Sequence, residues 1–248
     1  MDKKIDFLGI PIDALTMQET INKIENTILS NRQIHHSVVN AGKIVLMQND
    51  EKLNKSVLEA DLINGDGQAV VWAARLLGKS IPERVAGIDL MEKLIAVSAK
   101  KKYKCFFLGA EESVVAKVVE KYSSLYSDDI IAGYLNGYYS KEEENKIVNK
   151  IVRSKANILF VAITSPKKEI FLNKYKEELK SINLIMGVGG SFDVVSGKIK
   201  RAPEYMQKIG LEWLYRFSQE PKRMWKRYLV GNIQFSYLVI KNKIQGNY

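Results

Sequence analysis

The chain has 248 residues, of which 46% are hydrophobic and 27% are charged, and its formal net charge is +10. This composition is typical of a soluble globular protein with a substantial core. The single cysteine, Cys105, excludes an internal disulfide and favours a reducing, cytoplasmic setting. The N-terminal residues lack the pattern of a signal peptide, and the longest charge-free stretch near the C-terminus, residues 228–240, is too short to span a bilayer.

Residues 1–190 alternate short apolar runs with amphipathic segments. Thr16 with Glu19 and Ser140 with Glu143 have the spacing of capping boxes, which predicts a helix N-terminus at each pair. We expect helices over residues 16–30, 68–77, 88–102 and 141–154. We expect strands at residues 5–12, 35–39, 61–63, 104–108, 130–134, 158–163 and 184–188. This alternation predicts an α/β fold that is Rossmann-like, with a mainly parallel sheet flanked by helices.

The excess positive charge lies almost entirely in the last 51 residues. Residues 198–248 have 11 basic and 3 acidic side chains, whereas residues 1–197 have 27 and 25. The C-terminal segment also has many aromatic residues, and apolar residues such as Met224, Trp225 and Tyr228 can form one helical stripe beside its cations. This mixture is typical of a surface that meets anionic lipid. We therefore predict a core, residues 1–197, with a basic amphipathic C-terminal appendage, residues 198–248, for which packing against the core is the alternative.

Three loops follow predicted strands, at the edge of the sheet where ligands bind in such folds. The first loop, residues 64–67, contains Asp66 as its only carboxylate, between Gly65 and Gly67. Glycines on both sides let the backbone turn sharply and approach a ligand. Asp66 is therefore a candidate catalytic carboxylate, and a cap for the following helix is the alternative.

The second loop combines a helix start with positive charge. Ser165 is a suitable N-cap and Pro166 a suitable first helical residue, which places Lys167 and Lys168 in the first turn. Cations are unfavourable there unless an anion is bound, so the pattern suggests an anion site. Two solvated lysines offset by Glu169 are the alternative.

The third loop is rich in glycine, with Gly187, Gly189 and Gly190 directly after an apolar strand. Exposed backbone N–H groups could bind a phosphate or a sugar here, and close backbone packing is the alternative. The pattern is not the dinucleotide-binding fingerprint, because its glycine spacing differs and no acidic residue follows at the required distance.

Residues typical of other catalytic sites are largely missing. His35 and His36 are adjacent on a predicted strand and so face opposite sides, which favours structural roles over a metal pair. No sequence motif for a metal, a nucleotide-binding P-loop or a serine nucleophile is present. We expect neither a metal nor a cofactor.

Taken together and in this order, a series of motifs resembles the WecG/TagA/CpsF family of bacterial glycosyltransferases from about residue 5 to about residue 228. The motifs are Asn40-Ala41, Asp66-Gly67, Pro82 to Gly87, Phe107 to Ala110, Ser165-Pro166-Lys167, Gly187 to Asp193, Gly197-Lys198, Arg201-Ala202-Pro203, Gly210 to Arg216 and Glu220-Pro221.

The resemblance implies an inverting, metal-independent enzyme that moves N-acetylmannosamine or a related sugar from a UDP-sugar to an undecaprenyl-diphosphate-linked acceptor. Such an enzyme would act in cell-wall or surface polysaccharide synthesis, bound peripherally at the anionic inner face of the cell membrane, and a homo-oligomer is compatible with it. The family's base corresponds to Asp66, its donor-binding residues to Asn40 and Arg84, and its diphosphate- or acceptor-binding appendage arginines to Arg216, Arg223 and Arg227.

Three positions depart from the family pattern and leave the donor sugar open. Val38 replaces a threonine, Gly65 replaces a proline, and Lys168 replaces a glutamine in the donor site. The chemistry still agrees with the residues, since one carboxylate suffices as base and arginines can stabilise a leaving diphosphate. The alternatives are a Rossmann-type nucleotide-binding protein or oxidoreductase, which lacks its fingerprint here, and a basic nucleic-acid-binding protein, which leaves Asp66 and the charge-balanced core unexplained.

Overall fold

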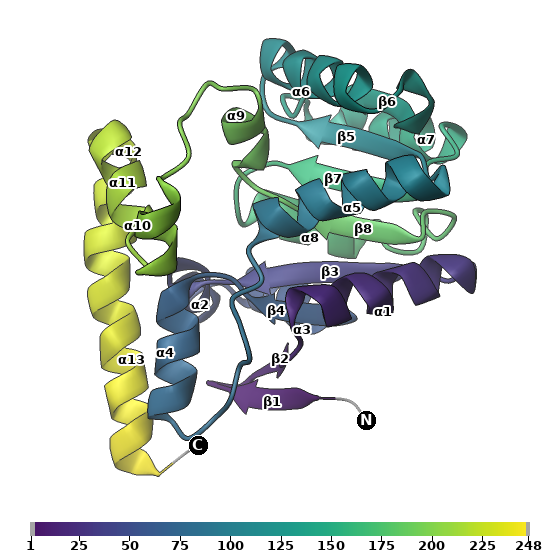
Figure 1. Ribbon diagram of the computed structural model, residues 1–248. Coiled ribbons are helices and arrows are strands. Elements are labelled where there is room, and N and C mark those ends of the chain that lie inside the picture. The colour runs from purple at the N-terminus through teal and green to yellow at the C-terminus, as the bar shows by residue number, and fades with distance from the viewer. Residues whose placement is uncertain (1–2, 247–248) are drawn as a thin grey trace.

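The computed structural model describes residues 3–246, except for the side chains of residues 223, 226 and 227. Six strands form one parallel sheet in the order β4-β3-β8-β7-β5-β6 (Figure 1). The strands are β3 (Ile34–Val39), β4 (Leu62–Gly65), β5 (Cys105–Gly109), β6 (Ile131–Leu135), β7 (Ile158–Ala162) and β8 (Leu184–Gly187). The α/β, Rossmann-like fold expected from the sequence is confirmed.

Helices cover both faces of this sheet because successive strand residues are apolar on both sides. Phe107 and Phe160 point into one core with helices α1, α5 and α6, whereas Phe106 and Leu159 point into another with α7 and α8. Cys105 is buried in the first core, as expected. The helices before the C-terminal segment are α1 (Met17–Leu29), α2 (Ala41–Met47), α3 (Glu51–Leu58), α4 (Gln68–Leu76), α5 (Gly87–Lys101), α6 (Glu112–Leu125), η1 (Asp128–Ile130), η2 (Lys141–Glu143), α7 (Glu144–Arg153) and α8 (Lys167–Lys174).

Both capping boxes expected from the sequence are present. The backbone N–H of Thr16 donates to Glu19 Oε2 at 2.8 Å, and the backbone N–H of Glu19 donates to Thr16 Oγ1 at 3.2 Å. Ser140 and Glu143 form the second box, which opens the short 3₁₀ turn η2 before α7. Local side-chain chemistry therefore places these helix starts correctly.

The single strand expected over residues 5–12 is wrong. These residues form an antiparallel hairpin of β1 (Lys4–Phe7) and β2 (Ile10–Asp13), separate from the main sheet. Leu8 and Gly9 have φ values of 55° and 78°, which reverse the chain in a two-residue loop. Apolar residues continue through the turn, so the sequence pattern does not reveal it.

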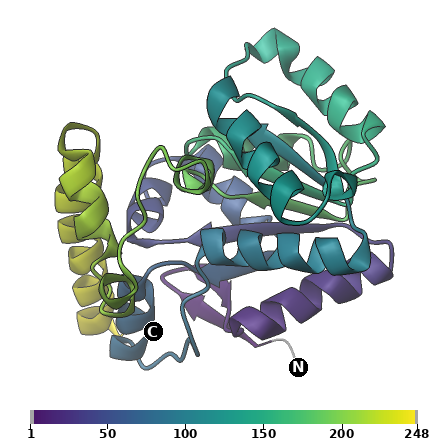
Figure 2. The same ribbon diagram turned by 45° about the horizontal axis from the view of Figure 1, so that its top comes forward.

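Beyond β8 the chain is helical and lies at the side of the molecule toward which the strands point (Figures 1 and 2). Helix α13 packs on α2 and places Phe235 and Val239 in the core, with the Phe235 ring centroid 6.4 Å from that of Phe7. The division into residues 1–197 and 198–248 stays a prediction. The helical elements after β8 are α9 (Ser191–Val195), α10 (Glu204–Lys208), α11 (Glu212–Gln219), α12 (Pro221–Trp225), the π-helical turn η3 (Lys226–Val230) and α13 (Gly231–Gln245).

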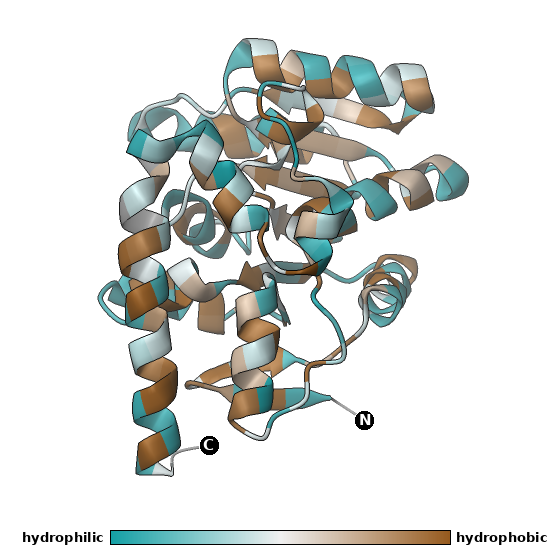
Figure 3. Cartoon of the chain, turned by 60° about the vertical axis from the view of Figure 1, so that its left-hand side comes forward, coloured by the Kyte–Doolittle hydropathy of each residue, from teal (hydrophilic) through white to brown (hydrophobic). Residues whose placement is uncertain are grey.

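The apolar residues expected to form one stripe around residues 223–230 are divided between the core and the surface. Met224 is buried and Trp225 is exposed. The ring centroid of Tyr228 is 5.8 Å from that of Trp213. The exposed apolar face instead continues along α13, where apolar and polar residues alternate along the helix (Figure 3). Its large exposed side chains are Trp225, Leu229, Ile233, Tyr237, Ile240 and Ile244. Within residues 3–246, no helix is both long and apolar enough to cross a membrane.

Candidate active site

The carboxyl ends of β4, β3, β8 and β7 bring the candidate residues to one edge of the sheet. Asp66 follows β4, Asn40 follows β3, Gly189 follows β8 and Lys168 follows β7. Because the strands are parallel, these ends meet at the same edge. The C-terminal helices lie on this side, so α11 can complete the site (Figure 1).

A backbone hydrogen bond fixes the position of Asp66, and its side chain does not cap a helix. Its N–H donates to Val39 O at 2.7 Å, on the neighbouring strand. Helix α4 begins after Gly67 and has no side-chain cap, so the helix-cap interpretation of Asp66 is wrong. The carboxylate is half-buried at the strand end, where a substrate hydroxyl could reach it.

Burial raises the pKa of Asp66 to about 6. The Arg84 guanidinium acts in the opposite direction, and the carboxylate of Glu212 adds to the increase. A carboxylate with this pKa is mostly ionised at neutral pH and is a stronger base than an exposed aspartate. These properties suit a general base.

Asn40 lies beside the Asp66 loop. Its Oδ1 atom accepts a hydrogen bond from the Lys43 backbone N–H at 3.0 Å and caps α2. A β-carbon placed on Gly67 would be 3.7 Å from the Asn40 Cβ atom, so the two loops are in contact. The Nδ2 group of Asn40 has no hydrogen-bond partner within the described residues and is available to a substrate.

Lys168 belongs to a buried cluster that the sequence did not reveal. Glu169 Oε1 is 2.6 Å from Lys168 Nζ and 2.7 Å from Lys43 Nζ, and it accepts a hydrogen bond from Ser165 Oγ at 2.8 Å. Burial raises the pKa of Glu169, but the two ammonium groups outweigh it and hold that pKa well below its usual range.

The expected helix start at Ser165 needs a correction. Helix α8 begins at Lys167 with Pro166 as its N-cap, and Ser165 bonds to the side chain of Glu169 instead. Lys167 is exposed and Lys168 is buried, so the two lysines do not form a pair at the helix N-terminus. Glu169 offsets Lys168 inside the protein, whereas the sequence alternative placed both lysines in solvent.

The glycine-rich loop is packed against two cations. A β-carbon on Gly187 would be 3.1 Å from Lys168 Cδ, and one on Gly190 would be 2.4 Å from Arg216 Nη2. The close packing considered from the sequence is therefore present at both glycines. Its partners are a lysine and an arginine, which makes this loop a wall of the same candidate site.

Helix α11 links Arg84 and Arg216. Arg84 Nη1 donates to Glu212 Oε2 at 2.9 Å, and Arg216 lies one helical turn after Glu212 on α11. The side chains of Arg223 and Arg227 lie outside the described part of the structure, so their binding roles stay predictions.

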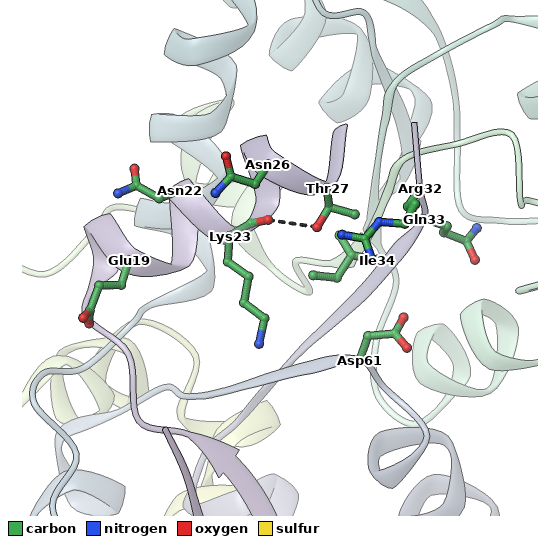
Figure 4. A pocket seen from close by; sticks show the side chains of 9 residues that line it. All are labelled: Glu19, Asn22, Lys23, Asn26, Thr27, Arg32, Gln33, Ile34 and Asp61. Atoms are coloured by element: carbon green, nitrogen blue, oxygen red, sulfur yellow. Dashed lines mark hydrogen bonds between the residues drawn. The ribbon is translucent and has the colours of Figure 1, made fainter. Parts of the chain in front are cut away.

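Two further features are the buried histidines of β3 and an open pocket beside α1. Both histidines are buried on β3, and His36 Nε2 is 3.0 Å from Asn64 Oδ1. A pocket of about 590 Å³ runs beside α1 near the amino ends of β3 and β4, with Lys23, Arg32 and Asp61 in its lining (Figure 4). None of the candidate residues lines it. Among the described residues, no group of three or more His, Cys, Asp or Glu side chains could hold a metal ion.

The chain is similar to known proteins. The sequence matches the model of the glycosyl transferase WecG/TagA/CpsF family over residues 5–248. It is also similar to proteins from Bacillus spizizenii (strain ATCC 23059 / NRRL B-14472 / W23) and Bacillus subtilis (strain 168), both named N-acetylglucosaminyldiphosphoundecaprenol N-acetyl-beta-D-mannosaminyltransferase. Identity is 39% over 170 and 171 residues, respectively. Each match covers 68% of this chain and 65% of the relative, which is slightly less than two thirds of the relative's length.

Proposed function

The chain belongs to the WecG/TagA/CpsF family of glycosyl transferases, and from this premise we propose that it transfers a sugar from a UDP-sugar to an undecaprenyl-diphosphate-linked acceptor. The observation that carries the proposal is the position of Asp66. It is a half-buried carboxylate at a strand end, it has a raised pKa, it does not cap a helix, and the Arg84 guanidinium acts on it.

The proposed reaction is an inverting displacement with Asp66 as the general base. Asp66 takes the proton of the acceptor hydroxyl while the hydroxyl oxygen attacks the anomeric carbon of the donor. The bond between that carbon and the UDP oxygen breaks on the opposite face, and UDP leaves with the electron pair. One base is sufficient for this step.

Fixed cations would stabilise the negative charge that develops on UDP. Arg216 and Lys168 flank the glycine-rich loop after β8, and a guanidinium can bind a diphosphate with two parallel hydrogen bonds. Preorganised cations of this kind lower the barrier without having to reorganise during the reaction. This arrangement supports a mechanism that does not depend on a metal.

The relatives' name supports N-acetylmannosamine as the donor sugar and an acceptor that ends in lipid-linked N-acetylglucosamine. The buried Lys168 lies next to Gly187. At position 168 the family pattern has a neutral glutamine, so this lysine can alter the preference for the donor sugar. We therefore infer UDP-N-acetylmannosamine or a closely related UDP-sugar as donor, with Asn40 and Arg84 contributing to its binding.

The C-terminal segment would bring this site to the membrane. The exposed apolar face of α12, η3 and α13 lies on a segment whose charge balance is strongly positive. Large apolar side chains beside cations suit the headgroup region of an anionic bilayer better than they suit nucleic acid. We propose peripheral attachment at the inner face of the cell membrane.

Incubation of the purified chain with UDP-N-acetylmannosamine and an N-acetylglucosamine-diphospho-lipid tests the function. We expect a lipid-linked disaccharide by mass spectrometry, with the β configuration at the new bond by NMR, from the α-linked donor. Release of UDP without formation of a disaccharide, or formation of an α-linked product, would contradict the proposed reaction.

A further inference from the structure

Two arginines and two carboxylates from three segments of the chain form an ion-pair cluster near Asp66. Arg84 lies in the loop before α5, Asp89 in the first turn of α5, Arg201 after α9, and Glu212 in the first turn of α11. Arg84 Nη1 is 2.9 Å from Glu212 Oε2, and Arg201 Nη1 is 2.6 Å from Asp89 Oδ1. The cross pairs are longer, at 3.7 Å for Arg84 with Asp89 and 3.9 Å for Arg201 with Glu212.

Glu212 joins the C-terminal segment to the loop that carries Arg84. Both arginines and both carboxylates are half-buried, so water screens their interactions less than it screens surface pairs. The next turn of α11 carries Arg216, which lies against Gly190. Helix α11 therefore contacts both Arg84 and the glycine-rich loop.

Arg84 lies near more than one carboxylate. Within the described residues its ion pairs are with Glu212 and Asp89, and Asp66 is not among its direct partners. Arg84 still acts on Asp66 through space. Without Glu212, the Nη1 group of Arg84 would lose a partner at 2.9 Å. Asp89 already pairs with Arg201 at 2.6 Å, so Asp66 is the other nearby carboxylate toward which Arg84 could turn.

We propose that Glu212 is a positioning residue that holds Arg84 on its own carboxylate and so keeps Asp66 available to the acceptor hydroxyl. The inference rests on the proposed function, in which Asp66 is the base. It makes catalysis depend on the placement of α11, because Glu212 reaches Arg84 only when this helix is docked. With α11 displaced, Arg84 would pair with Asp66 and weaken it as a base.

The charged groups around Asp66 determine the expected sign. Burial raises the pKa of Asp66, Arg84 and Lys43 lower it, and Glu212 and Asp89 raise it. Loss of the Glu212 charge removes one raising influence and frees Arg84 to increase its lowering influence. Both changes move the pKa of Asp66 downward.

The test compares pH profiles of kcat for the wild type and Glu212→Gln, with the proposed donor and acceptor. We expect the acidic limb to move to lower pH by about one unit and the plateau to fall about three- to tenfold, because a less basic carboxylate is a weaker catalyst. The matched control is Glu204→Gln, which removes an exposed carboxylate paired with Lys208 on α10. Its profile should match the wild type, and thermal melting checks that both variants fold.

A double-mutant cycle shows whether Glu212 acts through Arg84. In an Arg84→Gln background, Glu212→Gln should shift the acidic limb by less than half as much as in the wild type. An equal shift in both backgrounds would mean that Glu212 acts on Asp66 directly, which overturns the positioning role. An unshifted limb with reduced kcat in Glu212→Gln also overturns it and leaves a structural role only. Failure of the proposed function is distinct, since Asp66→Asn would then retain its turnover.

Discussion

The guanidinium of Arg216 occupies the space that a side chain on Gly190 would need, because a β-carbon there would be 2.4 Å from Arg216 Nη2. The two residues belong to α11 and to the loop after β8. Arg216 Nε is buried and has no hydrogen-bond partner among the described residues, so the group has unused capacity for an anion. This contact is where the C-terminal segment meets the glycine-rich wall of the site.

Gly190→Ala should therefore displace Arg216 and reduce turnover about 10- to 100-fold. The backbone of Gly190 has φ of −77°, which alanine adopts readily, so the effect should come from the contact and not from backbone strain. Steady-state kinetics and calorimetric binding of UDP would measure it. Gly231→Ala is the control, since a β-carbon there meets nothing within 4 Å. Unchanged kinetics in Gly190→Ala would remove Arg216 from the proposed site.

Transfer should continue in excess EDTA. The cations that we assign to the leaving diphosphate are Arg216 and Lys168, which a chelator does not remove. Product formation should be measured after EDTA treatment and again after addition of magnesium or manganese. Complete loss of activity that either metal restores would contradict the role given to these side chains.

Ile233→Ser combined with Ile244→Ser should weaken binding to vesicles that contain phosphatidylglycerol by about tenfold. These side chains are 72% and 81% exposed on the apolar face of α13. Wild-type binding should also weaken with added salt, since the segment is basic. Leu29→Ser is a suitable control because Leu29 is 71% exposed on α1. Co-sedimentation that is equal for the double variant and the wild type would show that this face does not meet lipid.

Folding stability should decrease as the pH falls from about 6.5 to about 4. Burial lowers the pKa of His35 and of His36 from 6.5 to about 4, so the unfolded chain binds protons in this range while the folded protein does not. Each histidine can contribute up to about 3 kcal/mol to this loss. Asp66 acts in the opposite sense, because its raised pKa favours the folded state at lower pH.

Urea unfolding at pH 7 and pH 4.5 would measure the difference. His36→Gln should reduce the pH dependence of the unfolding free energy, with Asn64 still able to pair with the new side chain. A pH dependence unchanged by this substitution would show that His36 does not supply the effect.

The sequence predicts much of the sheet and several helix starts, because these depend on local patterns. The helix over residues 87–101 buries Leu90, Leu94 and Ile95 as its spacing indicates. The N-terminal hairpin was missed because Leu8 adopts a left-handed conformation that leucine rarely prefers. The residues on either side of this turn have a pattern that suits one continuous strand as well as two short ones.

In the site, the sequence identifies individual residues better than their partners. Asp66 and the glycine loop follow strands, so their shared edge could be predicted from the order of elements. The partners could not, since Arg84 and Glu212 are 128 residues apart and meet only through the placement of α11. Lys43 is missed for the same reason, because its pairing with Glu169 depends on the adjacent positions of α2 and α8.

The most direct test of the account is turnover by Asp66→Asn, with UDP-sugar binding measured on the same sample. The substitution preserves the shape of the side chain and removes its ability to accept the acceptor's proton. We predict that UDP-sugar affinity and melting temperature stay close to wild type while kcat falls by about two to four orders of magnitude. Near-normal turnover in a preparation free of wild-type enzyme would contradict Asp66 as the base and, with it, the proposed mechanism.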